Sequence, residues 1–201
     1  MKVRKADFTD IDGIVQVHLQ SFPNFFLTSL GKMFLSEYYN IYIQYEHIAF
    51  VVEDSGNIEG FVVGTNSSES FYKDLKSNIR PFLIPIMTNV LNPKLIYKIA
   101  NRVYSVLFKK RVNEELKKYK DINELTSIGV SPSDQNKGIG SILLRAYEEY
   151  CLNEKVKGIY LTTDAESNDS VLNFYKKSGF EIDLTFYQGE ERKMHSLTKY
   201  F

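Results

Sequence analysis

The stretch of residues 127–150, SIGVSPSDQNKGIGSILLRAYEEY, carries most of the information about the fold. It starts inside a run that predicts a strand ending at Val130, and it ends inside an amphipathic helix predicted from Gly140 to Asn153. A glycine-containing turn joins the two elements. Its residues are Gln135, Asn136, Lys137, Gly138, Ile139, Gly140 and Ser141.

This turn is placed to bind a phosphate group. A helix N-terminus offers unpaired N–H groups and positive dipole charge, and glycines let the backbone approach an anion closely. Lys137 would add a cation. The stretch is not a P-loop, and it is not a dinucleotide fingerprint, because Leu143 stands where that motif needs a small residue. A purely structural turn stays open on this motif alone.

Strands and helices alternate on both sides of this stretch. NELTSIGV at residues 123–130 predicts the strand that leads into the turn. Downstream, the pattern predicts a strand at residues 158–165, a helix at residues 169–179, and strands at residues 180–189 and 191–200. This alternation indicates a mixed α/β sheet.

Residues 1–65 predict a strand, two helices and a hairpin. The strand at residues 2–4 precedes a helix capped by Thr9 or Asp10. Residues 25–45 predict a second helix, because apolar and aromatic residues recur at every fourth position and form an expected core face. These are Leu30, Phe34, Tyr38 and Tyr42. Ser-Gly-Asn between two runs rich in β-branched and aromatic residues, at residues 47–54 and 58–65, predicts the hairpin.

Residues 66–120 depart from this alternation. They begin polar, carry Pro81, Pro85 and Pro93, and then show helical periodicity. We interpret them as a helical insertion within a single domain over residues 1–201. A packed helical subdomain is the simplest role. A lid over the cleft, a dimer contact and a membrane contact are the alternatives.

The composition argues against several classes of function. The 25 basic residues balance the 25 acidic ones, so no general field would collect nucleic acid. Cys151 is the single cysteine, and the three histidines lie far apart in the sequence, which does not fit a metal site. The N-terminus lacks the apolar core of a signal peptide, and no stretch reads as a membrane span. We therefore expect a cytoplasmic protein without nucleic acid or metal.

Residues 127–150 resemble the acyl-CoA-binding segment of the GNAT superfamily, and SNDSVLNFYKKSGF at residues 167–180 resembles its downstream segment. The two matches occur in the family's order and cover residues 124–180. The resemblance implies an acetyl-CoA-dependent N-acetyltransferase that acts on a primary amine of a small molecule. It also implies the family's fold, a mixed, mostly antiparallel sheet of about seven strands flanked by helices, here with a helical insertion between the third and fourth strands.

The resemblance assigns the acetyl-CoA contacts to three parts of the chain. The strand end, Ile128, Gly129 and Val130, would hydrogen-bond the pantetheine arm, and the turn at residues 135–141 would bind the pyrophosphate. Asn168 would contact the pantetheine arm as well. An asparagine before a helical run is equally typical of a helix cap.

Two residues are candidates for the chemistry of amide formation. The family places a tyrosine like Tyr175 near the thioester sulfur, which makes it the candidate proton donor for the departing thiolate; the reference pKa is about 10 for the phenol and about 8.5 for a thiol. Packing beside Phe174 is the alternative for this ring. Glu124 resembles the position from which some family members use a glutamate as base, directly or through water. His18, on an apolar helix face, and His47, which we expect to be exposed, are lesser alternatives.

The acceptor side is predicted after the first helix. Phe22, Phe25 and Phe26 would form an aromatic wall, with core packing as the alternative. HLQSFPNFFLTSLG at residues 18–31 is similar to acetyltransferases associated with bacterial sugar or polysaccharide assembly, which implies an amino-sugar acceptor. The alternative function is a non-catalytic acyl-CoA-binding protein for regulation or assembly. A homodimer is an alternative to a monomer.

Overall fold

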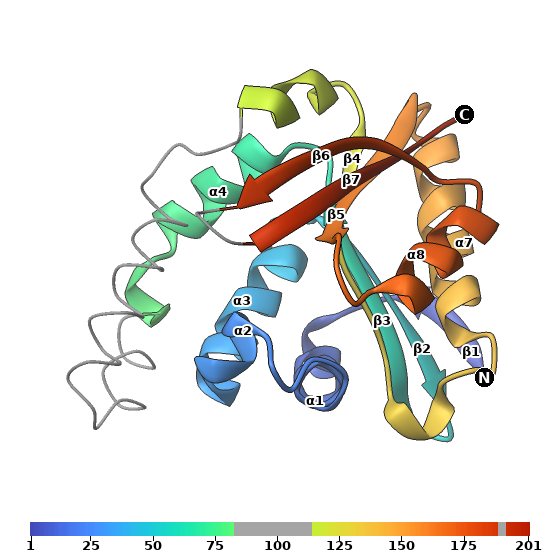
Figure 1. The fold of residues 1–201 in the computed structure, drawn as a ribbon. Coiled ribbons are helices and arrows are strands. Elements are labelled where there is room, and N and C mark those ends of the chain that lie inside the picture. The colour runs from blue at the N-terminus through green and yellow to red at the C-terminus, as the bar shows by residue number, and fades with distance from the viewer. Residues whose placement is uncertain (83–113, 189–191) are drawn as a thin grey trace.

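A computed structural model describes residues 1–82, 114–188 and 192–201. These residues build a seven-stranded sheet in the order β1-β2-β3-β4-β5-β7-β6 (Figure 1). Neighbouring strands are antiparallel, except that β4 and β5 run parallel. The predicted fold class is confirmed. The strands are β1 (Lys2–Lys5), β2 (Ile48–Asp54), β3 (Asn57–Thr65), β4 (Asn123–Val130), β5 (Gly158–Asp164), β6 (Glu181–Gln188) and β7 (Arg192–Tyr200).

Helices cover both faces of the sheet, and each face has its own apolar core. Successive residues of β3 alternate between the two cores, with Phe61 and Val63 in one and Val62 in the other. The first core packs under α1 (Ile11–Ser21), α2 (Phe26–Ser29), α3 (Lys32–Gln44) and α4 (Ser68–Ser77); the second packs under α7 (Ile139–Asn153) and α8 (Asp169–Lys177). Short 3₁₀ segments are η1 (Phe8–Asp10), η2 (Glu114–Tyr119) and η3 (Pro132–Asp134). None of the described helices is long and apolar enough to cross a membrane.

The second predicted helix is split in two. Gly31 lies between α2 and α3 with a φ of 84°, a left-handed conformation that favours glycine and interrupts a helix. The prediction of one continuous helix is therefore wrong, because the apolar periodicity continues across the break. The predicted core face is confirmed, since Leu30, Phe34, Tyr38 and Tyr42 are all buried.

The first helical segment, η1, is capped by Asp7. Of the two predicted caps, Asp10 stands at the N-cap position of α1, but its side chain makes no cap hydrogen bond to that helix. The Asp7 carboxylate accepts the Thr9 amide at 2.8 Å, and the Asp10 carboxylate accepts the Asp7 amide at 2.9 Å, which forms a capping box. The buried Asp10 carboxylate also accepts two N–H groups of Arg4 at 2.7 Å each. This side chain therefore ties β1 to the start of α1.

Most of the predicted insertion, residues 83–113, lies outside the described residues. Its two ends are described: α4 follows β3, and η2 leads into β4. Tyr119 of η2 stacks on Tyr160 of β5, with ring centroids 4.6 Å apart and an interplanar angle of 20°. Both ends therefore lie close to the centre of the sheet. A single domain that contains a helical insertion stays a prediction.

Gly64 of β3 lies directly against β4. A Cβ atom there would be 2.2 Å from the Tyr147 hydroxyl and 2.3 Å from the Glu124 carbonyl oxygen, which are hydrogen-bonded to each other at 2.7 Å. We expect Gly64→Ala to destabilise the protein by about 1–3 kcal/mol, the usual cost of overpacking a core. Urea denaturation checks this. Gly140→Ala is the matched control, since its Cβ would meet Phe174 at an ordinary 3.6 Å. Equal midpoints for the two variants would contradict the packing.

Candidate active site

A gap opens between the two parallel strands at the centre of the sheet. β4 and β5 pair only near their N-terminal ends, at Asn123 with Ile159 and at Glu124 with Tyr160. Beyond these pairs the strands continue without pairing to each other, so the sheet is splayed apart between them. The side chains that keep exposed surface there are Thr126, Ser127, Ile128 and Val130 on β4, and Thr162, Thr163 and Asp164 on β5. The predicted pantetheine-binding residues, Ile128 to Val130, lie on the part of β4 that pairs with β3 but not with β5.

The predicted phosphate-binding turn lies at the N-terminus of α7. Gly138 is the N-cap residue with a φ of 82°, and no side chain caps this helix end. A Cβ at Gly138 would meet nothing within 4 Å, so glycine is needed here for its conformation and leaves open space above the helix amides. A Cβ at Gly140 would lie 3.6 Å from the Phe174 ring and 3.9 Å from Val130. The turn therefore adjoins both the end of β4 and α8.

Lys137 is held by a neighbour in this turn. Its ammonium group pairs with Asp134 at 2.8 Å, and this hydrogen bond raises the pKa of Lys137. The side chain is 55% exposed. The predicted additional cation is therefore present at the turn, but it reaches a phosphate only by leaving Asp134.

Asn168 lies at the position before α8 and joins that helix to β5. Its side-chain amide donates to the Thr163 hydroxyl at 2.7 Å and to the Asp164 carbonyl at 2.9 Å. No side-chain hydrogen bond caps α8, so the side chain of Asn168 does not act as a helix cap. These bonds place Asn168 at the rim of the gap, beside the exposed end of β5.

Tyr175 lies in the core beneath α7 and α8. It is 5% exposed and packs edge-on against Phe174 and Phe180. Burial raises the pKa of its hydroxyl above the ordinary value. Because the pKa of a thiol is only about 8.5, complete proton transfer from Tyr175 to a free thiolate is uphill. A neutral phenol can still donate a hydrogen bond to a thiolate without giving up its proton.

Glu124 stands at the point where β4 and β5 separate. Its carboxylate accepts a hydrogen bond from the Ser68 hydroxyl of α4, and the Tyr160 hydroxyl lies 2.8 Å from that of Ser68. Burial raises the pKa of Glu124, and hydrogen bonds from Ser68 and Tyr160 oppose that shift. Part of the residue surface nevertheless remains exposed at the gap. A carboxyl in this environment is a suitable proton acceptor for catalysis.

The two alternative bases are buried and hydrogen-bonded. His18 Nδ1 lies 2.6 Å from the Tyr39 hydroxyl, and burial lowers the pKa of His18 to about 4. His47 contacts Asp74 at 3.1 Å and Thr65 at 3.2 Å, and burial lowers its pKa against the opposing effect of Asp74. The expectation that His47 is exposed is wrong, because α4 packs over it and leaves 8% exposed. These surroundings favour structural roles for both rings.

The three predicted acceptor-side phenylalanines occupy different environments. Phe22 lies against β4, since a Cβ at Gly129 would be 3.2 Å from its ring, and the Ser21 hydroxyl donates to the last carbonyl of β4 at 2.8 Å. Phe25 contacts Phe22 with ring centroids 5.1 Å apart and is 47% exposed. Phe26 is half-buried and packs on the core of α1 and α3. Phe22 and Phe25 thus lie at the end of β4.

A bulge in β4 adds polar groups that the sequence did not predict. Ser127 pairs with Val63 and Leu125 with Gly64, so Thr126 is the extra residue. As a result, neighbouring residues of β4 meet the tyrosines of α3. Tyr42 interacts with Thr126, and Tyr39 interacts with Ser127. The tyrosines of α3 were the sequence signal that could have predicted these contacts. Tyrosines that pack in a core and tyrosines that hydrogen-bond a neighbouring strand have the same spacing, so the pattern alone did not distinguish the two roles.

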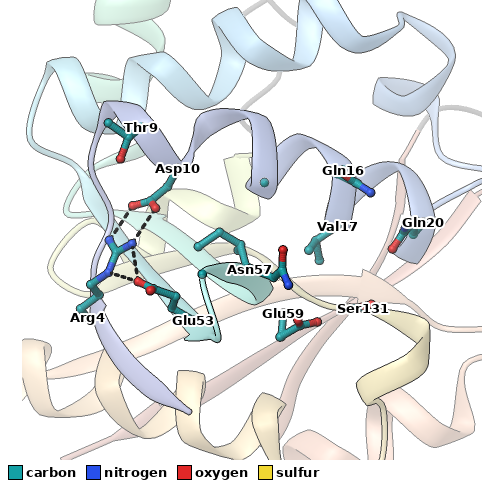
Figure 2. A pocket seen from close by; sticks show the side chains of 13 residues that line it. Arg4, Thr9, Asp10, Gln16, Val17, Gln20, Glu53, Asn57, Glu59 and Ser131 are labelled. Atoms are coloured by element: carbon teal, nitrogen blue, oxygen red, sulfur yellow. Dashed lines mark hydrogen bonds and ion pairs between the residues drawn. The ribbon is translucent and has the colours of Figure 1, made fainter.

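A separate hollow of about 430 Å³ lies between α1 and the β2–β3 hairpin (Figure 2). At one end the Arg4 guanidinium is held by Asp10 and Glu53. Its other polar lining residues include Gln16, Gln20, Asn57, Glu59 and Ser131. None of the residues predicted to bind acetyl-CoA, acceptor or proton lines it. The hollow is therefore distinct from the predicted site residues.

A family model and a curated protein each match part of this chain. Residues 96–180 match the model of the acetyltransferase (GNAT) family. Over 64 residues the chain is 42% identical to the uncharacterized protein YxbD of Bacillus subtilis (strain 168), a match that covers 30% of this chain and 38% of that protein. The match therefore spans well under half of the curated relative.

Solved structures share the fold over almost the whole chain. SsHAT has a TM-score of 0.69 at 18% identity, covering 99% of this chain and 97% of its own. The ribosomal-protein-alanine N-acetyltransferase from Brucella melitensis has a TM-score of 0.64 at 14% identity, covering 100% of both chains. Identities this low establish the fold, which is that of the GNAT acetyltransferases. The chain therefore shares the fold of these acetyltransferases and matches the GNAT family model over residues 96–180.

Proposed function

We propose that the protein transfers an acetyl group from acetyl-CoA to a primary amine of a small molecule, by direct attack in a ternary complex. The observation that carries this proposal is the position of Glu124. A carboxylate with a raised pKa lies where β4 and β5 part, on the strand that leads to an uncapped helix N-terminus. Acetyl transfer from acetyl-CoA needs a proton acceptor for the amine and a backbone site that binds the pyrophosphate of the cofactor.

The residues present fit acetyl-CoA. The edge of β4 that β5 leaves unpaired would offer backbone groups of residues 128–130 to the pantetheine arm, and Asn168 lies beside the end of β5. The turn at residues 135–141 offers helix amides and glycine clearance to the pyrophosphate. When bound, acetyl-CoA supplies the thioester carbonyl that the amine attacks.

Side chains and backbone groups of the protein would then accept the amine proton and stabilise the charges that develop. Glu124 accepts a proton from the acceptor ammonium or from the attacking amine, directly or through one water. Backbone N–H groups near Ile128 stabilise the oxyanion that forms as the C–N bond is made. As the C–S bond breaks, the Tyr175 hydroxyl hydrogen-bonds the departing thiolate, and solvent can complete its protonation. The products are an N-acetyl amide and free CoA.

An amino sugar is the acceptor we propose first. The similarity of residues 18–31 to acetyltransferases of sugar assembly supports it. Hydroxyl side chains of β4 and β5 that keep at least some exposed surface would hydrogen-bond a polyhydroxylated ligand; they are Thr126, Ser127, Thr162 and Thr163. Phe22 and Phe25 would form one wall. A cytoplasmic location, the absence of a nucleic-acid partner and the homodimer alternative stay predictions.

Release of free CoA tests the function and its acceptor together. Purified protein with acetyl-CoA is offered amino sugars, polyamines and peptide N-termini in parallel. The proposal expects amine-dependent CoA release and the largest rate with an amino sugar. A larger rate with another amine would replace the acceptor but keep the reaction. Tight CoA binding with no amine-dependent release would favour the non-catalytic alternative.

Tyr175→Phe separates catalysis from binding at the sulfur side. The change removes the hydroxyl and keeps the buried ring against Phe174 and Phe180. We expect turnover to fall by about tenfold or more while CoA affinity stays nearly constant, since a hydrogen bond to a developing charge acts in the transition state. Steady-state kinetics and calorimetric titration with CoA measure the two quantities. Unchanged turnover would leave Tyr175 a packing residue.

A further inference from the structure

Three side chains from distant parts of the sequence gather around the candidate base, Glu124. Ser68 of α4 donates to the Glu124 carboxylate, and its oxygen lies 2.8 Å from the Tyr160 hydroxyl of β5. The opposite face of this network is closed by Tyr119 of η2, which stacks on the Tyr160 ring at 4.6 Å. Ser68 and Tyr119 belong to the two described ends of the predicted insertion. The insertion is therefore joined to the base from both sides.

The direction of these hydrogen bonds follows from the charge on the carboxylate. An ionised carboxylate accepts hydrogen bonds but cannot donate them. Ser68 therefore donates its proton to Glu124, and Tyr160 donates its proton either to Glu124 or to the Ser68 oxygen. Two donors fix the orientation of the carboxylate and favour its ionised form. We propose that Ser68 and Tyr160 are positioning residues that hold Glu124 ready to accept the amine proton. This inference rests on the proposed function.

Among the described residues, no charged group contributes beside the two hydroxyls to the ionisation of Glu124. Hydrogen bonds from Ser68 and Tyr160 oppose the effect of burial on the pKa of Glu124, and no cation contributes. The other titratable groups that interact with Glu124 from the surrounding elements are phenols. They are Tyr38 and Tyr42 of α3, Tyr72 of α4 and Tyr147 of α7. Removing either hydroxyl should therefore raise the pKa of Glu124.

Ser68→Ala and Tyr160→Phe test the proposal, and each is measured in two ways. In pH–rate profiles, we expect kcat/KM to fall roughly ten- to hundredfold near neutral pH, the range that a hydrogen bond to a charged group supports. The rising limb of the pH–rate profile should move to higher pH, because a carboxyl with a higher pKa ionises only at higher pH. Carbon-13 NMR titration of the Glu124 carboxyl in the free protein should show the same upward shift. Ser70→Ala on the exposed side of α4 and Tyr187→Phe on β6 are matched controls.

The two measurements separate this inference from the proposed function. If the wild type transfers acetyl groups and both variants keep its rate, rising limb and carboxyl titration, Ser68 and Tyr160 are structural and the inference is overturned. If the wild type transfers nothing, the proposed function fails, and the NMR titration still decides whether these hydroxyls set the ionisation of Glu124. Circular dichroism checks that each variant is folded. Ser68→Thr keeps the hydroxyl that Ser68→Ala removes, so its pH–rate profile should show the rising limb of the wild type.

Discussion

Glu124→Gln is expected to lower the rate of acetyl transfer by about a hundredfold or more, the usual contribution of a general base. The amide oxygen of glutamine can still accept the Ser68 hydroxyl, so the local structure should persist. It cannot accept a proton at any pH used for assay. The effect therefore reports on proton transfer rather than on folding.

The pH dependence of this effect has a defined sign. Burial raises the pKa of Glu124, so the wild-type rate should increase with pH as that carboxyl ionises above its ordinary range. The deficit of Glu124→Gln should be largest where the carboxyl is ionised and the acceptor amine is still protonated. A pH–rate profile of both proteins measures it. If the variant keeps the wild-type rate and profile, Glu124 belongs to the scaffold.

Gly138→Asp is expected to weaken CoA binding by about a hundredfold or more. A carboxylate at this N-cap position would repel the pyrophosphate and occupy the helix amides that otherwise bind it. Calorimetric titration with CoA measures the loss. Gly138→Asn separates charge from size, since asparagine has the same shape, tolerates positive φ and carries no charge.

Gly56→Asp is the matched control within the chain. Gly56 has a φ of 85° and lies in the β2–β3 turn, and a Cβ there, like one at Gly138, would meet nothing within 4 Å. The two variants should therefore cost similar stability, and only Gly138→Asp should lose CoA affinity. Equal CoA affinities in the two folded variants would remove the pyrophosphate from the turn at residues 135–141.

The sequence predicted the regular parts of the fold well, because each element carries its own periodic or turn signal. The β4 prediction over residues 123–130 agrees with the structure, and the alternation after it gives the mixed sheet. The split between α2 and α3 was missed because Gly31 changes backbone conformation without interrupting the apolar stripe. His47 was misplaced because its burial depends on α4, a contact that no local pattern reveals.

The parts of the candidate site that a local motif determines could be predicted from the sequence. The parts whose surroundings depend on contacts between distant residues could not. The turn at residues 135–141 and the end of β4 follow from local spacing together with the family resemblance. The surroundings of Glu124 do not, since Ser68 lies 56 residues away in sequence and Tyr160 belongs to the next strand. The bulge at Thr126, which brings Tyr42 into contact with β4, likewise needs the pairing register of β3.

The products formed from acetyl-CoA and an amine test acetyl transfer at this site most directly. Mass spectrometry of a reaction with the wild-type protein and an amino sugar should show the N-acetylated sugar appearing in equal amount to free CoA, and Glu124→Gln should form both about a hundredfold more slowly or worse. Free CoA without an acetylated amine, or no product from any amine in the panel despite CoA binding, would contradict acetyl transfer to an amine at this site.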